Sequence, residues 1–226
     1  MRFKLTLTLI FAFCLLPIFQ ARAEDSLIGR MQKVEASIVD IRTVYSKTLT
    51  TKSGRKGIAS YERHGAGLII DPAGLIVTNA HIVINAPKIL VTLNGGETCE
   101  ANILYSNTAS DFSFIKISPP KPLQPIRWAE SSELNLGDKI IALGNSEINS
   151  QSIISGEITS ILTSKATGAI EFLEVNINLY QGDSGGPILD QQGRLLGLIM
   201  GKRLSQDRQS YAIASDKIRR EYLNYR

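Results

Sequence analysis

Short runs in which apolar and polar residues alternate fill most of residues 34–200, and turn-forming residues separate them. A period of two is typical of half-buried β-strands. The first half contains five such runs, at residues 65–70, 75–79, 88–93, 97–105 and 112–117. The second half contains six, at residues 139–143, 151–161, 172–177, 187–189, 194–200 and 209–214. Only the segment from Ser215 to Tyr222 looks helical, with Ser215 or Asp216 as its cap. The sequence therefore predicts an all-β protein with a short C-terminal helix.

A proline-rich segment divides the chain. Residues 119–125 hold four of the eight prolines, and proline cannot join a central strand because it lacks an N–H donor. We therefore expect a linker between two all-β units of roughly 95–100 residues each, residues 24–125 and 126–226. The stretch from Ser46 to Arg63 is basic and poor in apolar residues, and it predicts an exposed, irregular loop.

The first 23 residues have the features of a secretory signal peptide. Two basic residues precede an apolar run from Leu5 to Phe19, and Ala21-Arg22-Ala23 is a small-x-small cleavage pattern. The run has about fifteen residues, fewer than the roughly 20 that a membrane span needs. An uncleaved N-terminal anchor is the alternative. Either way the rest of the chain crosses a membrane, so we expect a periplasmic or secreted protein with no membrane contact after cleavage.

Removing this segment changes the composition that matters. It takes away three basic residues and no acidic one, which leaves 22 basic against 21 acidic residues, a net charge of +1. The remaining balance gives no reason to expect a nucleic-acid partner. Cys99 is then the only cysteine, so no internal disulfide is expected. With two histidines in the whole chain, a metal cluster is not expected either.

The string Gly182-Asp183-Ser184-Gly185-Gly186-Pro187 carries the strongest chemical signal. A serine hydroxyl attacks a carbonyl only when a base takes its proton and donors receive the charge on the substrate oxygen. The glycines let the backbone bend so that the N–H groups of Gly182 and Ser184 point into one concavity. The string also fits the Gly-x-Ser-x-Gly elbow of α/β-hydrolases. In that fold the histidine follows the serine, whereas His64 and His81 both precede Ser184.

His81 is the better candidate for the base. It directly follows an alternating run, so the end of a strand would hold its imidazole. His64 lies beside the basic stretch and is expected to be a surface residue. Asp111 directly precedes the run 112–117 and is the best candidate for the carboxylate that orients the imidazole.

Three other aspartates, Asp71, Asp138 and Asp190, look like turn residues. The order His, Asp, Ser is that of the chymotrypsin-type template. A subtilisin-type order would need an aspartate before His81, such as Asp40, together with a parallel α/β pattern. The sequence supports neither.

With these residues in place, the chain resembles the trypsin-fold serine proteases and is similar to their bacterial HtrA/Deg branch. The matching stretches run in the family's order and span nearly the whole mature chain: residues 65–71, 76–83, 110–117, 136–138, 142–145 and 182–189. The resemblance implies two six-stranded antiparallel Greek-key barrels with the active site between them. The first barrel would supply His81 and Asp111, and the second Ser184 and an oxyanion hole formed by the N–H groups of Gly182 and Ser184.

The implied activity is that of a serine endopeptidase that cleaves proteins or peptides through an acyl-enzyme, without a metal or organic cofactor. A rival interpretation is a catalytically silent module of the same fold that binds unfolded or partner proteins. Because HtrA relatives often form trimers, the resemblance also leaves a homo-oligomer as an alternative.

Three departures from the HtrA pattern stand out. HtrA proteins usually continue into PDZ domains, and this chain stops at Arg226, so we expect no such domain. Asp183 replaces the usual Asn. We expect its carboxylate to be paired, hydrogen-bonded or exposed. Control of the enzyme's latency by Asp183 is a hypothesis. Asn178 stands six residues before the serine, where the resemblance places the floor of the pocket for the residue before the cut bond. An Asp there would select Lys or Arg, so Asn178 predicts a preference for uncharged residues.

Overall fold

The computed structural model describes residues 26–50, 54–130, 134–146, 149–179, 182–202 and 209–225. The predicted signal peptide, residues 1–23, lies outside these ranges. Within them, no helix is both long enough and apolar enough to span a membrane.

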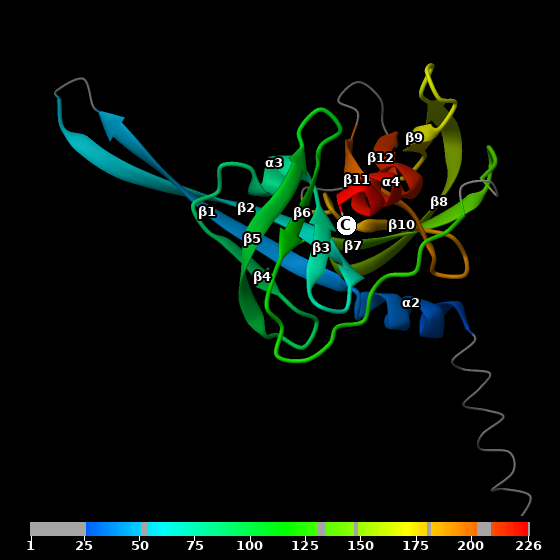
Figure 1. Cartoon of the computed structure of the whole chain (residues 1–226), viewed down its shortest axis with the longest axis horizontal. Coiled ribbons are helices and arrows are strands. Elements are labelled where there is room, and N and C mark those ends of the chain that lie inside the picture. The colour runs from blue at the N-terminus through cyan, green and yellow to red at the C-terminus, as the bar shows by residue number, and fades with distance from the viewer. Residues whose placement is uncertain are drawn as a thin grey trace, which may run out of the picture.

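The described residues form two closed barrels of six antiparallel strands each (Figure 1). The first barrel has the order β1-β2-β3-β6-β5-β4, and the second has the order β10-β11-β12-β9-β8-β7. In the first barrel, the chain runs through β1 (Ile38–Thr50), β2 (Lys56–Asp71), β3 (Leu75–Thr78), β4 (Ile89–Thr92), β5 (Thr98–Asn107) and β6 (Phe112–Lys116). The second consists of β7 (Lys139–Ser146), β8 (Asn149–Thr163), β9 (Ile170–Val175), β10 (Pro187–Leu189), β11 (Leu195–Lys202) and β12 (Ser210–Ala214). β3 lies beside β6 and not beside β4, which follows it in the chain, and this order is that of a Greek key. The predicted all-β class, the two barrels and the C-terminal helix α4 (Ser215–Tyr225) are confirmed.

The helical content was underestimated. The structure has a helix α2 (Leu27–Glu35) before the first strand and a single helical turn α3 (Ala80–Val83) after β3. The Ser26 hydroxyl caps α2 by accepting a hydrogen bond from Gly29 N at 3.1 Å. Only Met31 and Val34 of α2 are buried. Leu27, Met31 and Val34 nevertheless recur at helical spacing, so the sequence did carry a signal for this helix, and the prediction missed it.

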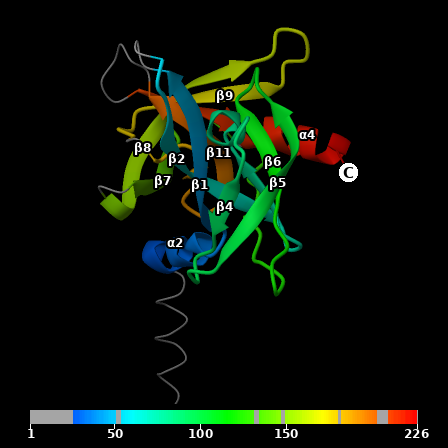
Figure 2. The ribbon, with the colours of Figure 1, turned by 90° about the vertical axis from the view of Figure 1, so that its left-hand side faces the viewer.

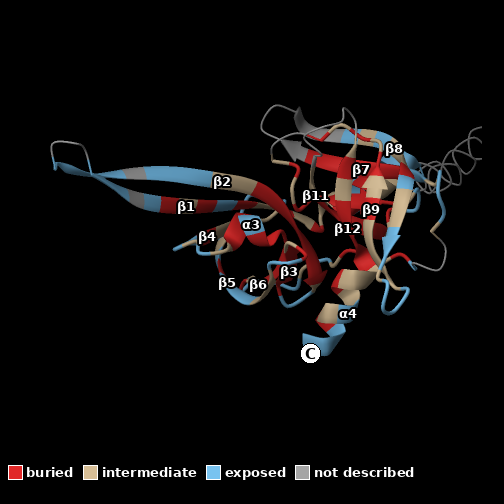
Figure 3. Cartoon of the chain, turned by 90° about the horizontal axis from the view of Figure 1, so that it is seen from above, coloured by how far each residue is buried: buried red, intermediate tan, exposed pale blue. Residues whose placement is uncertain are grey.

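The expectation of an irregular loop from Ser46 to Arg63 is wrong for the described part of that stretch. Strands β1 and β2 continue through it as a long hairpin, with register pairs from Ile38↔Leu68 out to Thr50↔Lys56. Figure 1 shows this hairpin projecting from the first barrel, and Figure 2 shows it pointing toward the viewer. Its outer part is exposed (Figure 3), with Ile58 at 77%. Strand pairing needs only backbone groups. Because neither face of the outer hairpin packs against a core, its sequence does not need alternating apolar residues, and the pairing leaves no pattern in the sequence.

One apolar cluster joins the two barrels. It combines Leu68 and Phe114 of the first barrel with Leu189 and Leu198 of the second, and α4 adds Tyr222. The Phe114 side chain is fully buried within it. The sole tryptophan, Trp128, packs against the same cluster just after the proline-rich linker.

Helix α4 ties the first barrel to the second through polar contacts as well. The Tyr105 hydroxyl donates to Glu221 Oε2 at 3.1 Å, and the Tyr222 hydroxyl donates to Asp71 Oδ2 at 3.4 Å. Burial, and then the hydrogen bond to Glu221, raise the pKa of Tyr105 above its ordinary value. The relative placement of the barrels is therefore held by a shared core and by the C-terminal helix.

Phe114→Ala should lower the free energy of unfolding by about 3–5 kcal/mol, because it leaves a cavity in the cluster that both barrels share. Urea unfolding followed by Trp128 fluorescence and by far-UV circular dichroism should give one common transition at lower urea. The exposed Leu223 is the control, since Leu223→Ala removes no buried contact. Separate transitions for the two signals would show that the barrels unfold independently.

Candidate active site

The topology brings His81 and Asp111 together. β3 pairs with β6, with Thr78 opposite Ser113, so the end of β3 lies beside the start of β6. His81 sits in α3 just after β3, and Asp111 immediately precedes β6. Asp111 Oδ2 lies 2.7 Å from His81 Nδ1, and Asp111 Oδ1 accepts the His81 backbone N–H at 2.9 Å. One carboxylate thus holds both the ring and the backbone of the histidine.

Asp111 adopts a left-handed backbone conformation, with φ 57°. Few residues other than glycine do so, and aspartate is among those that tolerate it. Its carbonyl accepts hydrogen bonds from Ala80 N at 3.2 Å and from Asn79 Nδ2 at 3.0 Å. The turn therefore directs both the carboxylate and the carbonyl of Asp111 toward the start of α3.

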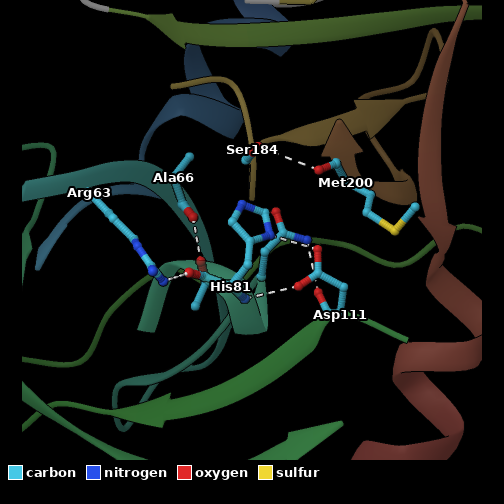
Figure 4. Close-up of polar contacts among 8 residues, drawn as sticks. Arg63, Ala66, His81, Asp111, Ser184 and Met200 are labelled. Carbon is cyan, nitrogen blue, oxygen red and sulfur yellow. Dashed lines mark hydrogen bonds and ion pairs between the residues drawn. The ribbon is translucent and has the colours of Figure 1, made fainter. Parts of the chain in front are cut away.

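The pairing fixes how the imidazole can act. With Nδ1–H donated to the carboxylate, the neutral ring presents Nε2 as a proton acceptor. The His81 side chain is 48% exposed and that of Asp111 23%, so the free side of the ring is accessible. In the view of Figure 4 the ring lies between Ser184 and Asp111.

The loop that carries Ser184 is docked on the first barrel. Ala66 N, in β2, donates to Ser184 O at 2.8 Å, and the Thr78 hydroxyl donates to Ala66 O at 2.7 Å. Gly185 has φ 84°, and a Cβ atom there would lie 1.9 Å from Ala66 O. Only a glycine in this conformation allows so close an approach.

The Ser184 hydroxyl donates to Met200 O at the long distance of 3.5 Å. Among the bonds of the described residues, it makes none with His81. The structure therefore brings His81 and Asp111 into direct contact and holds Ser184 through its backbone. Hydrogen bonds of catalytic groups are often long or poorly aligned before substrate binds. The assignment of His81, Asp111 and Ser184 as a triad stays a prediction.

The other two predicted site residues, Asn178 and Asp183, differ in how far they are buried. Asn178 is half-buried between Ile177 and Leu179, which are both buried. Asp183 is 2% exposed, and this excludes the exposed alternative for its carboxylate.

His64 lies at the surface, as expected, with Nε2 3.1 Å from Glu62 Oε2. The aspartates expected in turns are found there; Asp71 O, for example, accepts from Gly74 N at 3.0 Å. No group of three or more His, Cys, Asp or Glu residues in the described ranges could hold a metal ion.

Two residues of the site escaped the sequence analysis. Ala66 acts through its backbone N–H and C=O, which every residue type has, and so it gives no signal in the sequence. Thr78 reads as an ordinary strand residue. The close match of residues 65–71 to the HtrA pattern was the only hint that this strand does more than complete a barrel.

Known proteins are similar to this chain in sequence and in fold. The family model of the trypsin-like peptidase domain matches residues 65–198. A putative serine protease HhoA of Synechocystis sp. is 33% identical over 68% of this chain and 40% of its own length. The periplasmic pH-dependent serine endoprotease DegQ of Escherichia coli is 32% identical over 61% of this chain and 31% of its own length.

A solved structure of an HtrA-type protease with a decapeptide matches 88% of this chain and 66% of that chain, with a TM-score of 0.75. At 19% identity, this likeness shows the fold. The chain spans only 40% and 31% of the two bacterial relatives' lengths.

Gly185→Ala should lower reaction with a fluorophosphonate probe by about 100-fold, because a Cβ atom would force the Ser184 loop away from Ala66. The probe rate and circular dichroism would be measured together. Gly137→Ala is a matched control, since Gly137 also has φ 84° but a Cβ there meets nothing within 4 Å. Equal losses in both variants would mean that backbone strain, and not docking of the loop, is responsible.

Proposed function

The chain belongs to the trypsin-like peptidase domain family, and we propose that it is a serine endopeptidase in which Ser184, His81 and Asp111 form the catalytic triad. The observation that carries the proposal is the His81–Asp111 contact of 2.7 Å, which leaves the opposite ring nitrogen accessible. The docking of the Ser184 loop on β2 supports it further, because the loop of one barrel then reaches the face where the other presents His81.

The proposed reaction is acyl transfer. The Ser184 hydroxyl attacks the carbonyl carbon of the peptide bond while His81 Nε2 takes its proton. The N–H groups of Gly182 and Ser184 receive the negative charge that forms on the carbonyl oxygen. His81 then protonates the leaving amine, and water, activated by the same imidazole, releases the acyl group from Ser184. Asp111 stabilises the imidazolium that forms in both halves of the reaction.

The cleavage preference is proposed to depend on Asn178. Its half-buried amide, flanked by two buried apolar residues, offers no charge to a Lys or Arg side chain. Moving such a cation out of water without a partner is costly. We therefore assign a preference for uncharged residues before the cut bond.

The proposed location and partners rest on the predicted signal peptide and on the relatives. A protein that crosses a membrane behind residues 1–23 would act in the periplasm or outside the cell, and DegQ and DegP of Escherichia coli carry the word periplasmic in their names. The proposed substrates are proteins or peptides. The division into residues 24–125 and 126–226 assigns the base and the nucleophile to different halves of the chain.

Ser184→Ala should lower peptide hydrolysis by about 10⁶-fold and abolish labelling by a fluorophosphonate probe, because the attacking oxygen is gone. Labelling would be followed by intact mass spectrometry, with the exposed Ser155→Ala as the control. Failure of the unaltered protein to be labelled would favour the catalytically silent binding module instead.

Asn178→Asp should raise kcat/KM for peptides with Lys or Arg before the cut bond, relative to Ala or Val, by at least about 10-fold, since a buried carboxylate would then pair with the cation. Peptides that differ only at that residue would be compared. Asn102→Asp, which adds the same charge to an exposed position on β5, is the control. An unchanged ratio would place the selecting residue elsewhere.

A further inference from the structure

The short helix that carries His81 is also held from the side opposite Asp111. We infer that Arg63 and Tyr45, at the base of the β1–β2 hairpin, are positioning residues for the His81 imidazole. The inference rests on the proposed role of His81 as the base. Neither residue reaches the reacting atoms in the proposed mechanism; each would act through the backbone of α3.

Helix α3 is too short to hold itself together. It has four residues, and the bond from Ile84 N to Ala80 O at 2.8 Å closes its single turn. The last carbonyl groups of any helix lack partners within the helix and need outside donors. In α3 these include the carbonyls of His81, Ile82 and Ile84. Because His81 itself lies in this turn, the position of its side chain depends on how these carbonyls are satisfied.

Side chains of the hairpin supply the donors. The guanidinium of Arg63 donates to the carbonyl of His81 itself (Figure 4). The Tyr45 hydroxyl lies 3.1 Å from Ile82 O and 2.9 Å from Ile84 O, and its one proton is available to either. Thr43 makes the remaining bond, from its hydroxyl to Ile82 O at 3.1 Å.

The register explains why these side chains meet α3 together. Thr43 pairs with Arg63 and Tyr45 pairs with Tyr61, so the four side chains share one face of the hairpin. The ring of Tyr45 stacks on that of Tyr61, with centroids 5.0 Å apart and planes 7° apart. The Arg63 guanidinium carbon lies 4.5 Å from the centre of the Tyr45 ring. Arg63 Nη1 also donates to the Tyr45 hydroxyl at 3.4 Å. The stack of Tyr45 on Tyr61 and the cation–π contact thus hold the guanidinium in the position from which it donates to His81 O.

Strand β2 connects this arrangement to the nucleophile. Three residues after Arg63, Ala66 N donates to Ser184 O at 2.8 Å. One rigid strand therefore contacts the backbone of the base and the backbone of the nucleophile, which come from different barrels. Any displacement of Arg63 relative to Ala66 changes the separation of the imidazole from the hydroxyl. Without Arg63, Asp111 still holds the ring and the hydroxyls of Thr43 and Tyr45 still bind α3, but the carbonyl of His81 loses its donor.

The test compares Arg63→Ala, Arg63→Lys and Tyr45→Phe with the unaltered full chain. The rate of fluorophosphonate labelling and the labelled fraction would be measured separately. Arg63→Ala should slow labelling by about 10- to 100-fold, the loss expected when a catalytic group shifts by up to about 1 Å, while the labelled fraction stays complete. Arg63→Lys, which restores one donor but not the stacked fork, should recover part of the rate. Tyr45→Phe should slow labelling less, because stacking remains.

Arg42→Ala is the matched control. Arg42 is an exposed arginine of the same hairpin, next to Thr43 in sequence and on the opposite face, where it pairs with His64. Its removal should leave the rate unchanged. The inference is overturned if Arg63→Ala and Tyr45→Phe label at the full rate. It is also overturned if only the labelled fraction falls, because that outcome reports unfolding rather than misplacement.

A second readout separates this inference from the proposed function. The proton between His81 Nδ1 and Asp111 gives a far-downfield nuclear magnetic resonance signal whose sharpness reports how firmly the pair is held. We expect a sharp signal in the unaltered chain and in Arg42→Ala, and a broadened or lost signal in Arg63→Ala. If the unaltered chain is not labelled at all, the proposed function fails, and this signal still decides whether Arg63 positions His81. An identical signal in all three proteins would overturn the inference.

Discussion

The hydrogen bond from Ala66 N to Ser184 O is the constraint on which the site depends. The proposed base, His81, and the proposed nucleophile, Ser184, lie in different barrels, so no local sequence preference can set the distance between them. A backbone bond of 2.8 Å across the boundary sets it directly. The bond is possible because Gly185 lets the serine loop approach β2 without a side chain between them. The hydrogen bond from the Thr78 hydroxyl to Ala66 O then holds β2, whose Ala66 N–H is the donor, in place.

A single bond of this kind contributes only about 1 kcal/mol, so it needs support from the packing around it. The cluster that contains Phe114, Leu198 and Tyr222 supplies that support, because it is built from both barrels and from α4. Sliding one barrel over the other would open cavities throughout this cluster. The shared core therefore limits the relative movement of the barrels, and the bond between Ala66 and Ser184 selects the final alignment.

The sequence predicted the parts of the molecule that use side-chain patterns. The apolar pattern revealed eleven of the strands, of which some, such as β4, bury one face and others, such as β3, are buried on both. The placement of His81 and Asp111 next to strands β3 and β6 predicted that they would meet, and they do. Contacts made by the backbone left no such trace: Ala66 could be any small residue, and the outer hairpin pairs through N–H and C=O groups alone. Helix α2 was missed although Leu27, Met31 and Val34 recur at helical spacing, because its nine residues are a short window for that signal.

The length of the β1–β2 hairpin has a physical explanation in the same terms. Five register pairs, from Ser46↔Ser60 to Thr50↔Lys56, extend beyond the pair Tyr45↔Tyr61, and those of their residues whose burial is described are exposed. The ends of a two-stranded ribbon are its least stable part, because they open locally at low cost. A hairpin that turned at Tyr61 would place this opening next to Tyr45 and Arg63. The five outer pairs move it away, so the strand segment that contacts α3 and the Ser184 loop lies in the stable interior of the ribbon.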